Sequence, residues 1–236
     1  MQLNNNRREL YPTVMVDIAI FCADENGLRV LLVHRANEPQ KGLWALPGGF
    51  LKPDVDASLE SAARRVLIEK IGVDTPHLEE VCTFSGKERD PRGWSISVLF
   101  FALLPRDQVQ AVVKAKVDAV EWVDARDHGL AMAFDHSDHL NRAIEVLKRK
   151  VARHALPLHL MPTNFTMTAL QRACEAILGL TLDKSVFRRR LKADLEKRPP
   201  GIPDLVEVAG ATETGHQRPA QLYKAREGFV FLDLNS

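Results

Sequence analysis

The sequence predicts an α+β protein of two domains that meet near residue 155. Strand and helix patterns alternate along the first two-thirds of the 236 residues. The segment Ala155–Thr163, with two prolines, breaks this alternation. After it the pattern changes to two short helices and two strands. We therefore expect one domain over residues 1–155 and a second over residues 156–236.

The first domain begins with two strands and a turn. Thr13–Cys22 is β-branched and apolar, and Leu28–His34 has the same character after an Asp-Glu-Asn-Gly turn, so we expect a hairpin. A loop rich in Pro and Gly follows over Asn37–Phe50. The next element, Ser58–Lys70, has apolar residues at helical spacing, and Gly72 ends the predicted helix.

Three further strands and a second long helix complete the first domain. Strand patterns cover Val81–Phe84, Ser95–Leu104 and Ala119–Val123. His136–Arg153 places its apolar residues on one stripe, which predicts an amphipathic helix.

The second domain is predicted to contain two consecutive short helices. Thr168 begins a capping-box pattern and opens a helix that Gly179 closes. A second helix runs from about Lys184 to Leu195, with Thr181 or Asp183 as its N-cap. Two short helices joined in this way form a helix-turn-helix, whose second helix enters the DNA major groove.

The second helix has a basic face, and a wing follows it. Its exposed side gathers a hydroxyl and three cations: Ser185, Arg188, Arg189 and Lys192. Strand patterns at Leu205–Val208 and Gln221–Ala225 flank a connector of wing size, from which Arg218 would reach a minor groove or a phosphate. These residues predict double-stranded DNA as a partner. The alternatives are a solvated basic face and a winged helix that binds something other than DNA.

The overall composition is that of an ordinary soluble protein. With 32 basic and 31 acidic residues, the net charge of +1 exerts no general attraction toward nucleic acid, so DNA binding must come from local charge. The three cysteines form no CxxC pair, and free thiols are expected. No signal peptide precedes the first strand, and no segment approaches the about 20 apolar residues of a membrane helix. We expect a cytoplasmic protein without a membrane partner.

The stretch around the first predicted helix carries a recognisable motif. Leu46-Pro47-Gly48-Gly49-Phe50, followed by SLESAARRVLIEKIGV over Ser58–Val73, resembles the Nudix box of enzymes that hydrolyse nucleoside diphosphates linked to another moiety. The resemblance implies a Nudix-like α/β/α sandwich with a mixed sheet. In that family an Arg-Glu pair, a Glu-Glu pair one turn later and an earlier loop Glu hold Mg²⁺ against a pyrophosphate.

Most of those carboxylates are missing here. Arg65 matches the arginine of the motif, but its neighbour is Val66. The later pair is Glu69 and Lys70, and the earlier loop glutamate falls at Ala57. One carboxylate of four remains, and Lys70 adds a positive charge. We therefore expect very weak Mg²⁺ binding, with neither catalytic nor metal-ligating residues.

Two nearby carboxylates keep an alternative open. Asp56 or Glu60 would substitute for the missing ligands, because two extra residues make the loop register uncertain. In that case the chain would be an active Nudix hydrolase of ADP-ribose or a related nucleoside diphosphate. Otherwise Glu69 is a structural remnant that pairs with Arg65, four residues earlier.

Several other stretches resemble Nudix proteins that recognise ADP-ribose. They are Thr83-Phe84, Arg89–Val98 and Ala133-Phe134-Asp135-His136, while Arg35 and Gly42-Leu43-Trp44 precede the box as the substrate loop of the Nudix family does. A diphosphate needs cations, and an adenine needs a flat apolar partner. The candidates for the adenine partner are Trp44, Phe50, Phe84 and Trp94. We expect ADP-ribose as an effector, no cofactor, and these ligand-binding residues: Arg35, Trp44, Phe50, Lys87, Arg89, Arg92 and Asp135.

The two domains in this order resemble the Nudix-related transcriptional regulators of NAD metabolism. Val186–Leu191 and Arg218–Tyr223 look like the helix and wing signatures of that group. The resemblance implies a repressor of NAD biosynthesis and salvage genes rather than an enzyme. Such a repressor binds a palindromic operator as a homodimer and is released by ADP-ribose.

Overall fold

The computed structural model describes residues 11–75, 77–109, 117–127, 129–151, 156–189, 205–213 and 220–225. Within it the chain forms two compact units. The first comprises Met1–Cys22 and Arg29–Val146, and the second comprises Ala23–Leu28 and Leu147–Ser236. Lys192 and Arg218, two of the predicted DNA-binding residues, lie outside the described residues.

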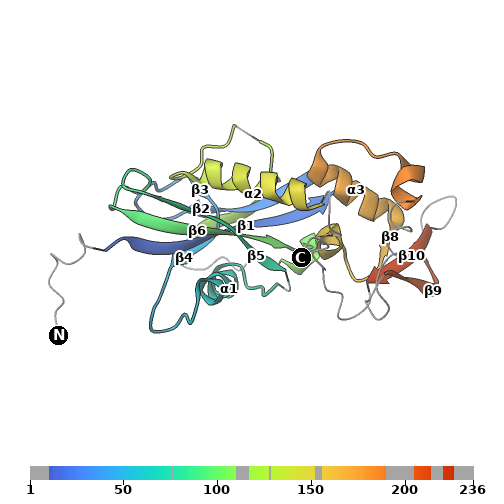
Figure 1. Cartoon of the computed structure of the whole chain (residues 1–236), viewed down its shortest axis with the longest axis horizontal. Coiled ribbons are helices and arrows are strands. Elements are labelled where there is room, and N and C mark those ends of the chain that lie inside the picture. The colour runs from blue at the N-terminus through green and yellow to red at the C-terminus, as the bar shows by residue number, and fades with distance from the viewer. Residues whose placement is uncertain are drawn as a thin grey trace. The chain divides into compact units, whose positions relative to one another are not determined.

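A seven-stranded mixed sheet forms the centre of the first unit (Figure 1). Its strands are β1 (Thr13–Asp24), β2 (Gly27–Arg35), β3 (Trp44–Ala45), β4 (Gly48–Phe50), β5 (Leu78–Gly86), β6 (Ser95–Leu103) and β7 (Val117–Asp124). Neighbours follow the order β3-β2-β1-β6-β5, while β4 pairs with β1 and β7 with β2. β1 and β6 run parallel, and β5 and β6 run antiparallel. Every predicted strand is present, and the predicted loop over Asn37–Phe50 contributes β3 and β4 in addition.

Two helices cover opposite faces of this sheet, α1 (Leu59–Lys70) on one and α2 (His136–Val151) on the other (Figure 1). The predicted α/β/α sandwich with a mixed sheet is confirmed. Ser58 caps α1, since its side chain accepts a hydrogen bond from the backbone of Ser61. Gly72 follows the helix with a φ of +79°, which explains why the helix ends there. A short 3-10 helix, η2, lies at Arg106–Gln108.

Successive side chains of β1 point to opposite faces of the sheet, so the sequence of β1 determines which side chains each face presents. Val16, Ile18 and Ile20 belong to one core cluster with the apolar side of α1. Asp17, between two of them, is also buried but lies next to His136 of α2. The sheet therefore has an apolar face against α1 and a face with buried polar groups against α2.

The second unit has its own small core. Its described elements are η3 (Leu156–Leu160), β8 (Phe165–Thr166), α3 (Met167–Leu178), helical residues 184–189, β9 (Leu205–Glu213) and β10 (Ala220–Ala225). The strands form an antiparallel sheet in the order β8-β10-β9. Leu158, Phe165 and Leu170 pack together with Phe187 and Tyr223. The two predicted wing strands are present, and β8 is an addition that the sequence pattern did not indicate.

The start of α3 corrects one expectation. The N-cap is Thr166 and not Thr168, because Thr166 is extended and its hydroxyl accepts a hydrogen bond from Ala169 N at 3.1 Å. Pairing of Thr166 with β10 fixes this extended conformation, which a local capping pattern does not reveal. The predicted end of the helix is confirmed, with Gly179 at a φ of +74°.

The three cysteines are free thiols, as predicted. Burial, together with the neighbouring charge of Glu175, raises the pKa of the Cys174 thiol to about 12. None of the helices in the described ranges has both the length and the apolar character needed to cross a membrane.

Candidate functional site

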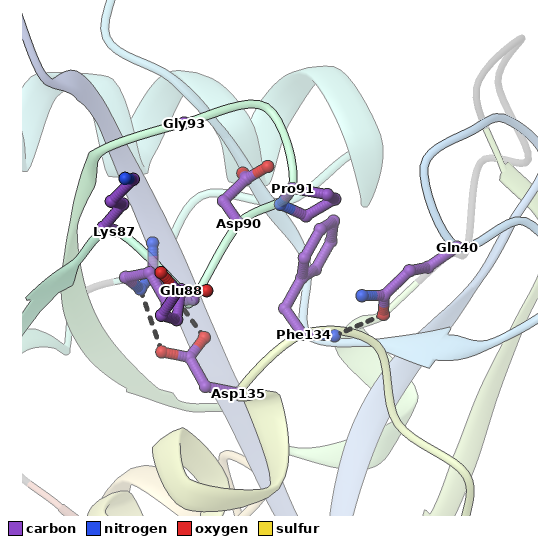
Figure 2. Close-up of a pocket in the computed structure, with 9 residues that line it drawn as sticks. Gln40, Lys87, Glu88, Asp90, Pro91, Gly93, Phe134 and Asp135 are labelled. Atoms are coloured by element: carbon purple, nitrogen blue, oxygen red, sulfur yellow. Dashed lines mark hydrogen bonds and ion pairs between the residues drawn. The ribbon is translucent and has the colours of Figure 1, made fainter.

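A cavity of about 550 Å³ opens in the first unit (Figure 2). The loop after β2 contributes Gln40, and the β5–β6 loop contributes residues 87–91 and Gly93. The segment before α2 contributes Phe134 and Asp135. A hollow of this volume with a few converging polar groups is typical of a small-molecule site.

Arg89 and Asp135 form a rigid ion pair in the wall of the cavity. The Nε and Nη2 groups of Arg89 donate to the two carboxylate oxygens of Asp135 at 2.9 and 2.8 Å. Nη1 of Arg89 donates to the hydroxyl of Ser95 at 3.1 Å. Partial burial alone would raise the pKa of Asp135, but contacts from His139 and Arg89 outweigh it and hold that pKa well below its usual range. The pair links the β5–β6 loop to the start of α2.

Arg92, from the same loop, lies beside two aromatic rings. Its Nε and Nη2 groups donate to the carboxylate of Asp90 at 2.9 and 2.6 Å. Its guanidinium carbon lies 4.9 Å from the centroid of the Phe50 ring and 5.7 Å from that of Phe134. These distances are within the range of cation–π attraction. Asp90 therefore orients Arg92 toward the aromatic surface.

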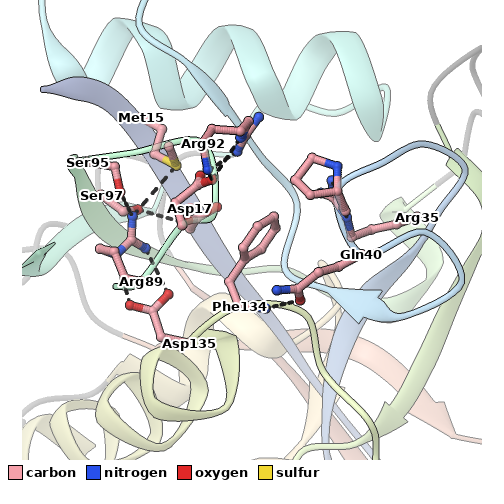
Figure 3. Close-up of polar contacts among 12 residues, drawn as sticks. Met15, Asp17, Arg35, Gln40, Arg89, Arg92, Ser95, Ser97, Phe134 and Asp135 are labelled. Atoms are coloured by element: carbon pink, nitrogen blue, oxygen red, sulfur yellow. Dashed lines mark hydrogen bonds and ion pairs between the residues drawn. The ribbon is translucent and has the colours of Figure 1, made fainter. Parts of the chain in front are cut away.

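Arg35 approaches the same ring from the end of β2 (Figure 3). Its guanidinium carbon lies 4.8 Å from the centroid of Phe134, and its Nε and Nη2 groups donate to the carbonyl of Pro39. Within the described residues it forms no ion pair. Burial, and then the positive charge of Arg92, lowers the pKa of Arg35. Two guanidinium groups that approach one ring despite their repulsion form an arrangement that favours an anionic ligand.

The predicted ligand-binding residues occupy different places around this cavity. Lys87, Arg89 and Asp135 line it, while Arg35 and Arg92 contact the ring of Phe134. Phe50 is half exposed and lies under Arg92.

The aromatic candidates Trp44, Phe84 and Trp94 are not among the lining residues. The ring of Trp44 packs edge-on against His34, that of Phe84 lies 3.9 Å from the ring of His139, and Trp94 is half exposed.

Sequence reasoning missed Phe134 and Gln40 as individual site residues. Phe134 lies inside the stretch Ala133–His136 that had been associated with ADP-ribose recognition, so a signal for it was available. Gln40 lies in an irregular loop and had no distinguishing pattern. The two residues are 94 positions apart, and the fold brings them together.

The charged side chains of α1, the helix that carries the Nudix-like box, form ion pairs with one another and with the preceding loop. Arg65 donates through Nε and Nη2 to both oxygens of the buried Asp56, at 2.7 and 2.8 Å. Hydrogen bonding from Arg65 lowers the pKa of Asp56 to about 2. Arg65 also donates to Glu69 at 3.1 Å, the pairing expected from their spacing, and Lys52 lies 3.2 Å from the same carboxylate.

The residues at and near the other motif positions also make structural contacts. Val66 is buried in the core cluster, and a side chain at Gly49 would clash with it. The ammonium of Lys70 donates to the carbonyl of Gly48. Glu60, one of the possible substitutes, pairs with Arg64 at 3.0 Å. Asp56, Glu60 and Glu69 thus all have cationic partners, and the residues present do not fit the Mg²⁺ site of a Nudix hydrolase.

One buried group has the donor set of a metal site. Asp17, His136 and His139 present ligand atoms that lie within 4.8 Å of one another. However, Leu46 N donates to His136 Nδ1 at 2.9 Å, and burial lowers the pKa of His136 to about 4, so this ring is neutral with its proton on Nε2. Nε2 then has no lone pair to offer toward Asp17. Asp17 and His139 alone are too few ligands for a zinc site.

In the second unit, Asp183 caps the helical residues 184–189. Its carboxylate accepts from Val186 N at 2.8 Å and from the hydroxyl of Ser185 at 2.6 Å, which selects Asp183 over Thr181. Arg188 and Arg189 are exposed, whereas Phe187 packs into the core. The described part of the helix therefore separates an apolar side from a basic side.

The chain has clear similarities to known families and proteins. Residues 13–144 match the NUDIX domain family, and residues 157–225 match the NrtR DNA-binding winged helix domain. Over 214 residues it is 43% identical to the "ADPR responsive transcriptional repressor NtrR" of Acinetobacter baylyi, covering 90% of this chain and 82% of that protein. It is 35% identical to an ADP-ribose pyrophosphatase of Methanocaldococcus jannaschii, over 57% of this chain and 74% of that protein.

Solved structures agree with these similarities. The NrtR protein of Shewanella oneidensis in complex with a 27mer DNA aligns with a TM-score of 0.79 at 34% identity, covering 90% of this chain and 93% of that one. The NUDIX domain of the same protein in complex with ADP ribose aligns with a TM-score of 0.54 at 36% identity, covering 62% of this chain and 99% of that one.

Proposed function

The chain belongs to the Nudix family and has the winged helix domain of the NrtR regulators C-terminal to its Nudix domain, and from this premise we propose that it is a transcriptional repressor controlled by ADP-ribose. The observation that carries the proposal is a combination of two features. In the first unit, the guanidinium groups of Arg35 and Arg92 lie beside Phe134, a residue that lines the cavity, and in the second unit a helix has an exposed basic face. One feature suits a diphosphate ligand and the other suits DNA.

The chemistry of the cavity supports ADP-ribose as the ligand. Arg35 and Arg92 approach the Phe134 ring, and their positive charges match a diphosphate. Lys87 adds a further positive charge to the lining. The ring of Phe134 offers apolar surface to the adenine or a ribose. Arg89 and Asp135 neutralise each other and shape the wall between them.

Binding without hydrolysis is part of the proposal. Nudix chemistry depends on divalent ions that several carboxylates hold against the diphosphate. Here Asp56 and Glu69 are bound to Arg65 and Lys52, and Lys70 contributes an additional cation. A divalent cation at this helix would have to displace these partners and remain beside three positive side chains.

For DNA recognition we propose the basic side of the helix that begins after Asp183. Ser185, Arg188 and Arg189 lie on its exposed side, and Lys192 and Arg218, predicted from the sequence, complete the proposed contact set. Cations on such a face contact base edges and phosphates. A single module of this kind makes few contacts, so we propose a homodimer on a palindromic operator.

The regulatory direction we propose is release of DNA on ligand binding. ADP-ribose would prefer a dimer geometry that cannot contact both half-sites, and by linkage the operator would weaken ADP-ribose binding by the same factor. The proposed targets are genes of NAD biosynthesis and salvage, and the proposed compartment is the cytoplasm.

The test of this function is a gel shift with duplex DNA from upstream of an NAD-salvage operon, with and without ADP-ribose. We expect a complex without the ligand and its loss with the ligand. Arg188→Ala and Arg189→Ala should each weaken the complex by roughly tenfold and reduce the salt slope by about one. Arg142→Ala, at a surface arginine paired with Glu145, is the matched control. Absence of any complex, or a complex indifferent to ADP-ribose, would contradict the proposal.

Hydrolysis is tested separately. We expect no magnesium-dependent release of AMP from ADP-ribose above the background rate, whereas the pyrophosphatase alternative requires ordinary enzymatic turnover. An assay with purified full-length chain, magnesium and chromatographic detection of AMP decides between them.

A further inference from the structure

Two residues that line the cavity have an unfavourable backbone conformation. Gln40 has a φ of 61° and Phe134 a φ of 54°. Among the described residues, these are the non-glycine residues with positive φ. In this region the Cβ atom approaches a carbonyl oxygen, so ordinary side chains rarely adopt it. Surrounding contacts must hold both residues in place.

The two residues are hydrogen-bonded to each other. Phe134 N donates to Gln40 Oε1 at 2.6 Å, across 94 residues of sequence (Figure 2). Both line the cavity. The same bond therefore connects two strained backbone positions, and it lies in the lining of the cavity where the ligand is proposed to bind.

The flanking residues connect this bond to the cations of the site. Pro39, which precedes Gln40, holds the guanidinium of Arg35 through its carbonyl, at 3.1 and 2.7 Å. Asp135, which follows Phe134, holds Arg89. A change in the backbone at Gln40 or Phe134 would therefore alter the positions of both arginines.

The ring of Phe134 is the surface that Arg35 and Arg92 share (Figure 3). Its direction depends on the backbone conformation of Phe134. Without the bond from Gln40, relaxation of Phe134 to negative φ would turn the ring away from the guanidinium groups. The two arginines would then lose the common aromatic surface against which they are arranged.

We propose that Gln40 is a positioning residue of the ligand site, whose amide oxygen holds Phe134 in its left-handed conformation and thereby sets the geometry of the Arg35–Arg92 anion subsite. This inference rests on the proposed function, because the anion is taken to be the diphosphate of ADP-ribose. Gln40 acts through Phe134 and needs no direct contact with the ligand.

The main test compares Gln40→Ala with the wild-type full-length chain by calorimetric titration of ADP-ribose. We expect the Kd to rise by roughly tenfold, the usual consequence of losing one well-made hydrogen bond at a site. Gln108→Ala, at an exposed glutamine of η2 outside the cavity, is the matched control and should leave the Kd unchanged. A Kd for Gln40→Ala within twofold of wild type would overturn the proposal.

A second readout does not depend on the ligand. Hydrogen exchange of the Phe134 amide, followed by NMR in the unliganded chain, should be slow in wild type and at least tenfold faster in Gln40→Ala. Gln40→Glu keeps an acceptor oxygen and should retain the protection. If Gln40 only stabilised another part of the loop, this retention would not be expected. Equal exchange in wild type and Gln40→Ala, or loss of protection in Gln40→Glu, would refute the proposed bond.

The two readouts separate this inference from the proposed function. If wild type does not bind ADP-ribose, the proposed function fails, while the exchange rates still decide whether Gln40 holds Phe134. If wild type binds ADP-ribose and Gln40→Ala binds it equally well, the function stands and the positioning role is wrong.

Discussion

The first domain has two clusters of charged side chains, one around the box helix and one around the cavity. The cations of the two clusters have different kinds of partner. In the box, Arg65 directs its donors to Asp56, Glu69 and the carbonyl of Phe50. In the cavity, Arg89 and Arg92 each bind one carboxylate, while Arg35 binds a backbone carbonyl without an ion-pair partner in the described structure. Arg65 and its carboxylates form a closed cluster, in which each charge has a partner. The cations beside Phe134 form an open cluster, because Arg35 has no ion-pair partner among the described residues.

This difference concerns what the cations of each cluster contact. Val66 and Lys70 occupy two motif positions where the Nudix box has carboxylates, and Lys70 adds a cation. Asp56 and Glu69, the carboxylates nearest Arg65, are paired with arginine and lysine. Arg35 and Arg92, beside Phe134, take their hydrogen-bond partners from outside that helix, so binding of an anion there, as proposed, does not depend on a metal site at the helix.

The largest effect should come from the cation without an ion-pair partner. Arg35→Ala is expected to weaken ADP-ribose binding by roughly a hundredfold, since charge-assisted hydrogen bonds to a phosphate contribute about 2–3 kcal/mol. Calorimetric titration measures the change, and Arg142→Ala, at an arginine of α2 that pairs with Glu145, serves as control. An unchanged Kd would mean that Arg35 is not an available cation of the ADP-ribose site.

The closed cluster should respond in stability instead. Arg65→Ala leaves the buried carboxylate of Asp56 without its cation and should lower the unfolding midpoint of the first unit by roughly 5 °C. Tryptophan fluorescence follows this unit selectively, because Trp44, Trp94 and Trp122 all belong to it. The Kd for ADP-ribose should stay within about threefold of wild type. Lost binding with an unchanged midpoint would show that the two clusters act as one site.

Acid should weaken the closed cluster within a defined pH window. Hydrogen bonding from Arg65 lowers the pKa of Asp56 to about 2, from an ordinary value of 3.8. Since the folded pKa lies below the unfolded one, the contribution to stability is complete above about pH 4 and disappears as the pH falls toward about 2. The difference in unfolding midpoint between wild type and Asp56→Asn should therefore shrink over this window. A difference that is constant from pH 7 to pH 2 would contradict the assigned ion pair.

The smallest effect should be that of magnesium. If the cations of the chain replace a divalent ion, millimolar Mg²⁺ or EDTA should change the affinity for ADP-ribose by less than about twofold. Potassium chloride at the same ionic strength controls for screening. A tenfold gain in affinity that only Mg²⁺ produces would show that the box helix still takes part in binding.

Local sequence patterns predicted the secondary structure well where the causes are local. Ser58 and Gly72 mark the ends of α1, since capping and left-handed glycine act within a few residues. The pairing of Arg65 with Glu69 followed from their spacing on a helix. Where the cause was a distant strand, the prediction was wrong, as at Thr168, because pairing of Thr166 with β10 moved the cap.

The sequence by itself determined that only one of the four carboxylate positions of the box, Glu69, keeps its carboxylate, because residue identity at fixed helical spacing can be read directly. It also determined the order of the two domains through their separate motifs. Only the tertiary structure paired Arg89 with Asp135, and only it placed Gln40 against Phe134. The Arg89–Asp135 and Gln40–Phe134 contacts join loops far apart along the chain, and their geometry depends on how the sheet brings the loop ends together, which no local pattern encodes.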